Sequence, residues 1–301
     1  MYHLPVLLEA SVDGLAIQPN GTYVDVTFGG GGHSRAILER LGPEGRLFGF
    51  DQDEDARANI PDDPRFTFVA GNFRYLQRFL RLEGVRTVDG ILADLGVSSH
   101  QFDTAERGFS YRFEADLDMR MNQAGDVTAA DLIADRSIEE LQHLFSRFGE
   151  VRNAKTLATR IVEQRAIRKI ERVEDFIEAI TPIIRGNRPR YLAQVFQALR
   201  MEVNDEVGAL EDFLTDSKEV LAPAGRLVVI SYHSIEDRLV KAFLKTGNIE
   251  GEVKKDFYGK IDRPFKIWTK RAVVASEEEI TQNPRSRSAK LRIAERLGNE
   301  E

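Results

Sequence analysis

Four consecutive glycines form the segment of this chain best suited to hold a ligand close to the backbone. They occupy residues 29–32 and precede His33 and Ser34, where a predicted strand turns into a predicted helix. Glycines at such a turn allow close approach, because no Cβ atom stands between the backbone and the ligand. The dinucleotide fingerprint G-x-G-x-x-G is not met, since its last position falls on Ser34 or Arg35.

An alternative interpretation is the S-adenosylmethionine loop of Rossmann-like methyltransferases, which has an acid on the preceding strand and constrains the last glycine less. Asp25 supplies that acid. Asp51 ends the second predicted strand, 19 positions after Gly32, where a carboxylate can accept both ribose hydroxyls of an adenosine. The competing interpretation is a glycine turn followed by a solvated acid at a helix start. Asp51 in this register favours a nucleotide-like cofactor.

Asp94 ends the fourth predicted strand and is the candidate catalytic residue. Ligands of open α/β sheets bind at the carboxyl ends of the strands, and amino-group methyltransferases place an acid or amide there. Those enzymes usually continue with Pro-Pro-aromatic, whereas this chain continues with Leu95-Gly96-Val97. The structural alternative is that Asp94 caps the segment that follows.

Alternating strands and helices must position these residues. Strands are predicted at residues 22–28, 46–51, 65–70 and 88–95 with helices between them, which predicts a parallel α/β sheet. Helical runs dominate from about residue 106 to 213, and a strand returns at 226–231. We therefore expect an α/β domain of residues 1–105 and 214–301 that carries an all-helical insertion at 106–213.

Composition excludes several classes of chemistry. None of the 301 residues is Cys, so disulfides, Cys-ligated metals and thiolate nucleophiles are excluded. No His/Asp/Glu set has metal-ligand spacing, so we predict no essential metal. The N-terminus lacks the basic start of a signal peptide and no apolar run is long enough to span a membrane, so a cytoplasmic protein without membrane contact is expected. The sequence does not indicate the oligomeric state.

The net charge of -7 conceals two basic segments. Residues 152–172 and 254–271 each carry seven Lys or Arg against two acids, and both are candidate RNA contacts. The connection at residues 101–121 mixes Arg, Phe and Tyr, which can stack on nucleotides; equally, Arg107 and Arg120 can pair with nearby acids inside the protein.

Two motifs near the carboxyl end allow alternative interpretations. Ser234 and Asp237 resemble a capping box with Asp in place of Glu, and a Ser/His/Asp hydrolase is disfavoured because adjacent residues do not form a triad. The basic run at residues 283–292 can clamp phosphates or form a solvated terminal strand.

Taken together, the motifs resemble the bacterial MraW-type family of small-subunit rRNA cytosine-N4 methyltransferases. The matching runs lie at residues 3–9, 31–34, 89–99, 107–110, 117–121, 196–200, 233–238 and 283–292. The resemblance implies a Rossmann-like class I methyltransferase, S-adenosylmethionine as methyl donor, and the N4 amine of a decoding-centre cytidine in 16S rRNA, in the small ribosomal subunit, as acceptor. The cofactor contacts that it implies are Gly31, Gly32, His33, Asp51, Phe73, Asp94 and Gln101.

The resemblance also suggests a mechanism. The lone pair of a cytosine N4 is delocalised into the ring, and an acceptor for the amine hydrogens localises it for in-line attack. Asp94 is the candidate acceptor, with holding the cofactor as its alternative role. The absence of Cys excludes carbon-5 methylation, which relies on Cys attacking the ring. Two other functions stay open: methylation of DNA amines or a small molecule, and a non-catalytic RNA-binding or ribosome-assembly module.

Overall fold

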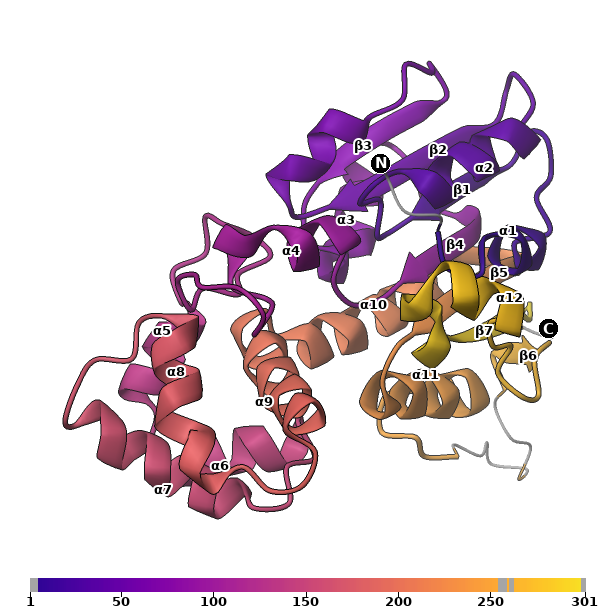
Figure 1. Cartoon of the computed structure of the whole chain (residues 1–301). Coiled ribbons are helices and arrows are strands. Elements are labelled where there is room, and N and C mark those ends of the chain that lie inside the picture. The colour runs from indigo at the N-terminus through magenta and orange to yellow at the C-terminus, as the bar shows by residue number, and fades with distance from the viewer. Residues whose placement is uncertain (1–4, 254–258, 260–262, 299–301) are drawn as a thin grey trace. The chain divides into compact units, whose positions relative to one another are not determined.

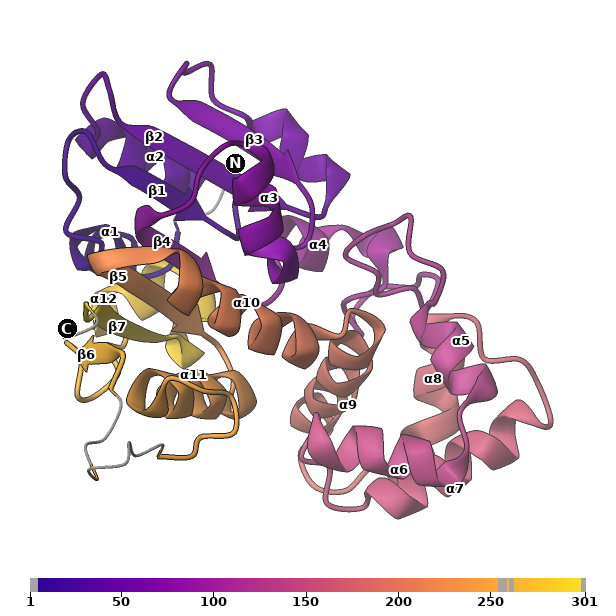
Figure 2. The ribbon, with the colours of Figure 1, turned by 180° about the vertical axis from the view of Figure 1, so that it is seen from behind.

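The computed structural model describes residues 5–253, 259 and 263–298. The chain forms two compact units, one of residues Met1–Gly96 and Val207–Glu301 and the other of Val97–Glu206. Figures 1 and 2 show the ribbon from opposite sides. The predicted basic segment at 254–271 falls partly outside the described residues. No helix among the described residues is both long and apolar enough to cross a membrane.

The first unit is built on a seven-stranded sheet with the order β3-β2-β1-β4-β5-β7-β6. The first five strands in the chain pair in parallel, and β7 runs antiparallel to β5 and β6. This arrangement confirms the predicted Rossmann-like α/β fold. The strands are β1 (Thr22–Asp25), β2 (Arg46–Asp51), β3 (Phe66–Ala70), β4 (Val88–Asp94), β5 (Leu221–Ser231), β6 (Phe265–Ile267) and β7 (Lys290–Arg296).

Helices cover both faces of this sheet, as expected for a parallel sheet (Figure 1). On one face the apolar side chains of α3, α10 and α11 pack on the strands, and on the other those of α1 and α2 do. The helices of this unit are α1 (Leu8–Gly14), α2 (Gly32–Arg40), α3 (Leu76–Leu82), α10 (Glu206–Val220), α11 (Ser234–Thr246) and α12 (Glu277–Gln282), with 3₁₀ turns η1 (Glu54–Asn59), η2 (Phe73–Tyr75) and η5 (Pro284–Ser288).

The second unit is helical, as predicted for this part of the chain. Its core is formed by large side chains that the helices bury, among them Phe145, Phe176 and Leu199. Thr128 and Ser137 begin α5 and α6 with reciprocal capping boxes, which satisfy the first backbone N–H groups of each helix. The elements are α4 (Ser99–Asp103), η3 (Ala105–Arg107), α5 (Ala129–Asp135), α6 (Ile138–Arg147), α7 (Ala154–Arg165), α8 (Val173–Ile180), η4 (Thr181–Ile183) and α9 (Arg188–Val203).

The unit boundaries differ from the predicted insertion of residues 106–213. The helical unit begins at Val97 and ends at Glu206. α10 belongs almost wholly to the sheet unit, because Leu210, Phe213 and Leu214 are buried in the core of the sheet. Helical periodicity reveals that a segment has an apolar face, but it does not reveal which core that face enters.

Candidate active site

Three carboxylates end three adjacent strands of the sheet. Asp25 ends β1, Asp51 ends β2 and Asp94 ends β4. In the strand order, β1 lies between β2 and β4. The chain moves from β1 outward to β2 and β3, and then returns to form β4 on the other side of β1. A sheet opens a crevice at such a switch point, and ligands of doubly wound folds bind there. The structure therefore brings the predicted acids to one edge.

The glycine loop follows β1 at this edge and has the backbone that its residue types predict. Gly29 and Gly31 have positive φ values of 48° and 72°, and α2 begins at Gly32. A Cβ on Gly32 would lie 2.2 Å from Cγ of Pro5. Glycine at position 31 permits the positive φ of the loop, and glycine at position 32 leaves room for the Pro5 ring.

Asp51 is bonded directly to the glycine loop. Its Oδ2 accepts the Gly29 N–H at 2.8 Å, and its Oδ1 accepts the Asp53 N–H at 2.9 Å. Burial raises the pKa of Asp51 to about 6. A carboxylate offers about four acceptor positions, so two stay available for hydroxyl donors. The half-buried Asp51 therefore fits the ribose of an adenosine beside the loop.

Asp25, the acid expected before the glycine loop, forms hydrogen bonds with residues on both sides of that loop. The side chain is 1% exposed, and its carboxylate accepts hydrogen bonds from the Ser34 hydroxyl at 2.7 Å and the Thr27 N–H at 3.1 Å. Burial raises the pKa of Asp25. These bonds join the end of β1 to the first turn of α2, so Asp25 fixes the position of the loop.

Asp94 is held at both its backbone and its side chain. Its backbone N–H donates to Oγ1 of Thr27 at 2.7 Å, and its Oδ1 accepts the Tyr232 hydroxyl at 2.7 Å. Its Oδ2 lies 3.8 Å from Nδ1 of His33, which is too far for a hydrogen bond. The side chain is 22% exposed. Oδ2 therefore retains acceptor capacity that a ligand can use. Burial raises the pKa of Asp94 to about 6.

His33 sits beneath the loop with its ring nearly buried. Nε2 lies 3.2 Å from the carbonyl oxygen of Val6. A carbonyl only accepts hydrogen bonds, so we assign the ring proton to Nε2. Nδ1 then turns its lone pair toward Asp94 when the ring is neutral. His33 therefore lies between Val6 and Asp94, at the start of α2.

Tyr232 is a site residue that the sequence reasoning missed. It directly follows the carboxyl end of β5, and its backbone N–H donates to Oε2 of Glu236 at 3.0 Å. Burial and the Asp94 charge raise the pKa of Tyr232 well above its ordinary value. Its hydroxyl therefore keeps its proton and donates it to Asp94. The available signal was its place at the end of the restored strand, beside β4.

The two remaining predicted cofactor contacts, Phe73 and Gln101, lie in different units of the chain. Phe73 begins η2 just after β3 and packs edge-on against Phe213, with ring centroids 5.5 Å apart. It thus lies at the same edge of the sheet as Asp51. Gln101 belongs to the helical unit, where its side chain accepts the Ser98 N–H at 3.1 Å and completes the capping box of α4.

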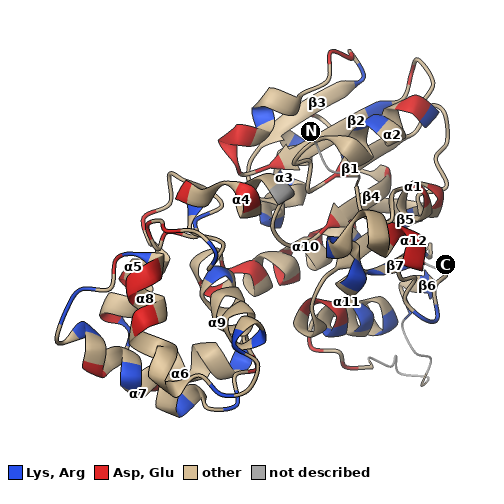
Figure 3. Cartoon of the chain, viewed as in Figure 1, with Lys and Arg blue, Asp and Glu red and all other residues tan. Residues whose placement is uncertain are grey.

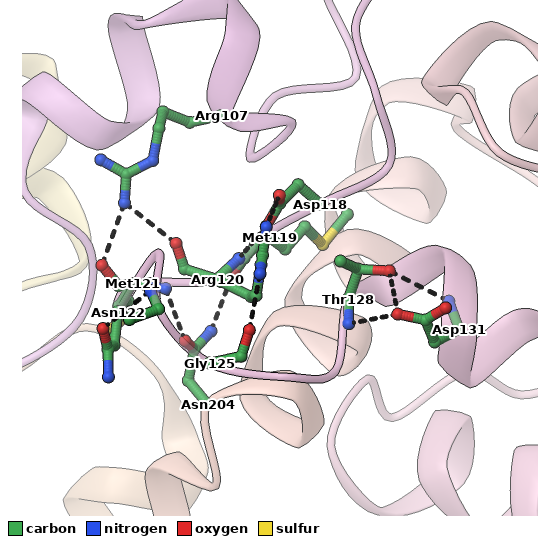
Figure 4. A network of polar contacts seen from close by, with 11 residues as sticks. Arg107, Asp118, Met119, Arg120, Met121, Asn122, Gly125, Thr128, Asp131 and Asn204 are labelled. Atoms are coloured by element: carbon green, nitrogen blue, oxygen red, sulfur yellow. Dashed lines mark hydrogen bonds and ion pairs between the residues drawn. The ribbon is translucent and has the colours of Figure 1, made fainter.

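Arg107 and Arg120 have roles inside the helical unit (Figure 4). Arg107 is 8% exposed and donates to the carbonyl oxygens of Arg120 and Met121. Arg120 forms two hydrogen bonds with the Asp118 carboxylate and a third with the Gly125 carbonyl. The guanidinium groups organise the loop after η3. The Arg120–Asp118 pair confirms the predicted alternative of pairing with a nearby acid, whereas Arg107 donates to backbone carbonyls.

Asn204, at the end of α9, joins the same loop. Its side chain accepts the Met121 N–H at 2.7 Å and donates to the Met119 carbonyl at 2.8 Å (Figure 4). Met119 has a positive φ of 64°, an unfavourable backbone that the two bonds hold in place. The connection is therefore an ordered part of the helical unit.

The motifs near the carboxyl end support the sheet. The predicted capping box of Ser234 and Asp237 is wrong, because His233 is the N-cap residue of α11. Asp237 instead pairs with Arg292 at 2.7 Å and Lys290 at 3.3 Å. The predicted solvated strand at the end of the basic run is β7, which is inside the sheet between β5 and β6.

Comparison with known proteins agrees with this geometry. The sequence matches the MraW methylase family over residues 1–297. A protein named ribosomal RNA small subunit methyltransferase H from Bacteroides fragilis (strain YCH46) is 57% identical over 296 residues, covering 98% of this chain and 97% of that protein. Proteins of the same name from Parabacteroides distasonis and Flavobacterium johnsoniae are 56% and 54% identical, each covering 98% of both chains.

Proposed function

This chain belongs to the MraW methylase family, and we propose that it methylates the N4 amine of a decoding-centre cytidine in 16S rRNA. It is an S-adenosylmethionine-dependent methyltransferase. The observation that carries the rRNA substrate is the name shared by relatives that are 57% and 56% identical over almost the whole chain. The observation that favours an amine acceptor is the partly exposed Asp94 carboxylate at the end of β4.

We assign the cofactor to the edge of the sheet around the glycine loop. Gly31, Gly32 and His33 would shape the loop around the cofactor, Asp51 would accept its ribose hydroxyls, and Phe73 would lie beside its adenine. Bound S-adenosylmethionine supplies a methyl group that its sulfonium already makes electrophilic. We retain Asp94 and Gln101 as proposed cofactor contacts, and their substitution tests whether they affect cofactor affinity.

In the proposed reaction Asp94 orients the acceptor amine. Tyr232 occupies Oδ1 of Asp94, which leaves Oδ2 to accept an N4–H of the cytosine. This bond draws the N4 lone pair out of the ring and aligns it for attack, so the contribution is positioning and electrostatics. The new N4–C bond would form as the C–S bond of the sulfonium breaks, and a neutral thioether would be the leaving group. N4 then has a surplus proton, and the Asp94 carboxylate can take that proton. The target base must leave its stack to reach the site.

Methyl transfer is expected to fall as the pH decreases through about 6. Burial raises the pKa of Asp94 to about 6, so below that pH the carboxyl is increasingly protonated and Oδ2 accepts more weakly. The single-turnover rate measured at saturating cofactor between pH 5 and 8 should show this acid limb. A rate that stays flat across this range contradicts the assignment of Asp94 as the acceptor.

Replacing Tyr232 with Phe is expected to lower the single-turnover rate roughly tenfold with little change in cofactor affinity. The Tyr232 hydroxyl stabilises the charged form of Asp94. Without that donor the pKa of Asp94 rises, so the acid limb of the rate should move to higher pH. A purely structural role of Tyr232 would lower activity without moving the acid limb.

The direct test is mass mapping of methylcytidine in small-subunit rRNA from cells with and without this protein. Loss of one N4-methyl mark at the decoding centre, restored by the wild-type gene, supports the proposal. Labelled-methyl assays on naked DNA, free rRNA and assembled small subunits separate the other acceptors. Subunit binding without any methyl transfer would instead favour a ribosome-assembly module.

A further inference from the structure

The predicted RNA-binding segment at residues 152–172 is mostly engaged within the protein. Arg160 and Arg165 donate to backbone carbonyls of Ala179, Ile133 and Arg136. Three further cations form ion pairs with acids of the same unit; they are Arg168, Lys169 and Arg172. Only Arg152 and Lys155 of this segment are left as exposed cations without such bonds among the described residues.

Arg152 and Lys155 instead belong to a group of cations that are contributed by several elements of the helical unit. We call this group the cationic end. Its members are exposed and form no ion pair with an acid in the described part of the chain. They come from the end of α6, the start of α7 and the segment that leads into α9, where Figure 3 shows Lys and Arg gathered. The cationic end consists of Arg147, Arg152, Lys155, Arg185, Arg188 and Arg190.

Hydrogen bonds join the segments that carry these cations. Nδ2 of Asn153 donates to the carbonyl of Ile183 at 3.0 Å, which ties the start of α7 to η4. Nε2 of Gln197 donates to the carbonyl of Phe148 at 2.8 Å, which ties α9 to the end of α6. A cavity of about 530 Å³ lies beside Lys155, between α7 and η4. The segments that carry the six cations are therefore joined to one another within the helical unit.

The placement of these cations is unfavourable for stability. Lys155 lies in the first turn of α7, whereas Arg188 and Arg190 lie in the first turn of α9. Neither of these turns contains an acid. The N-terminus of a helix is its positive end, where cations typically destabilise by about 0.3–1 kcal/mol. In contrast, α5, α6 and α8 of the same unit begin with acids. A charge pattern that opposes folding points to a ligand that compensates it.

We propose that the cationic end binds the phosphate backbone of the rRNA substrate outside the target nucleotide. Exposed guanidinium groups are suited to phosphate oxygens. The start of α7, where the N-cap residue Asn153 makes no side-chain cap bond, adds to the attraction. Residues 181–192 contain no acid and residues 147–155 only Glu150, so the surface is strongly positive. This inference rests on the proposed rRNA substrate and adds the surface that holds it.

The test compares two double variants with equal loss of charge. Arg188→Gln with Arg190→Gln removes two cations of the cationic end. Arg136→Gln with Lys169→Gln removes two exposed cations that already pair with Glu140 and Glu171. Binding of each variant to small-subunit rRNA is measured across a series of salt concentrations, with cofactor affinity and thermal unfolding measured in parallel.

The cationic-end variant is expected to bind rRNA roughly tenfold more weakly, and the slope of log K against log salt should decrease by about 1.4–1.8, as for two lost phosphate contacts. Its cofactor affinity should be unchanged and its thermal stability equal to or above that of the wild type. The control pair should bind like the wild type.

Equal rRNA affinity and equal salt slopes for the two variants would overturn the cationic end as the binding surface. Weaker rRNA binding with an unchanged salt slope would also overturn it, because the loss of phosphate contacts must lower that slope. Failure of the wild type itself to methylate rRNA contradicts the proposed function instead, so the two failures are distinguishable.

Discussion

Replacing Asp94 with Asn is expected to reduce the rate of methyl transfer by roughly 10²–10³-fold while cofactor affinity changes little. The amide keeps an oxygen for the Tyr232 hydroxyl, which now donates to Oδ1 at 2.7 Å. In the variant, the NH₂ group of the amide lies at the position that Oδ2 occupies in the wild type. That group donates hydrogen bonds and takes no proton, so it neither orients the N4 amine nor accepts its surplus proton.

Single-turnover methylation and equilibrium binding of S-adenosylmethionine separate the two roles of Asp94. The loss should lie almost entirely in the rate, and the acid limb near pH 6 should disappear. If cofactor affinity falls as far as the rate, Asp94 serves to hold the cofactor and its catalytic assignment is wrong. Asp51→Asn is the matched comparison, because it is expected to weaken cofactor binding more than it slows a saturated enzyme.

Replacing Gly108 with Ala is expected to destabilise the helical unit by about 3 kcal/mol or more. Gly108 has a φ of 70°, and a Cβ there would lie 2.4 Å from the carbonyl oxygen of Asp116 and 2.9 Å from the Asp118 nitrogen. Both atoms are backbone, so they cannot move aside as a flexible side chain can. The network around Arg107 and Arg120 would have to open to make room.

Gly186→Ala is the matched control in the same unit. Gly186 has a φ of 74°, and nothing lies within 4 Å of a Cβ built on it. This variant therefore carries only the strain of a left-handed alanine, about 1 kcal/mol. Hydrogen exchange of the amides in α5 to α9 measures both variants where the effect is expected. Equal loss of protection in the two variants would contradict the role assigned to close packing at Gly108.

Local pattern was sufficient to predict which residues lie at the carboxyl edge of the sheet. The alternation of strands and helices predicted the parallel sheet, and parallel topology brings the carboxyl ends of β1, β2 and β4 to one edge. Asp51 and Asp94 could therefore be assigned to that edge from their places at strand ends. The glycine loop was equally readable, because Gly31 has the positive φ that favours its residue type.

Interactions between distant segments could not be read in this way. Tyr232 meets Asp94 across 138 positions of the chain, and that contact exists only because β5 pairs with β4. Composition left Arg107 and Arg120 open between RNA and internal partners, and their contacts in the fold place them inside the helical unit. The same holds for residues 152–172, whose charges looked free in the sequence and are mostly engaged in the folded unit.

The sequence by itself thus determined the family, the sheet, the glycine loop and the acids at the strand ends, because each is encoded over a few consecutive residues. Tertiary structure decided the partner of Asp94, the core that α10 enters and which cations of the described residues lack an ion pair. The physical reason is that burial and pairing depend on which surfaces meet. A segment carries its own apolar face and charges, but the residues that cover or neutralise them come from elsewhere in the chain.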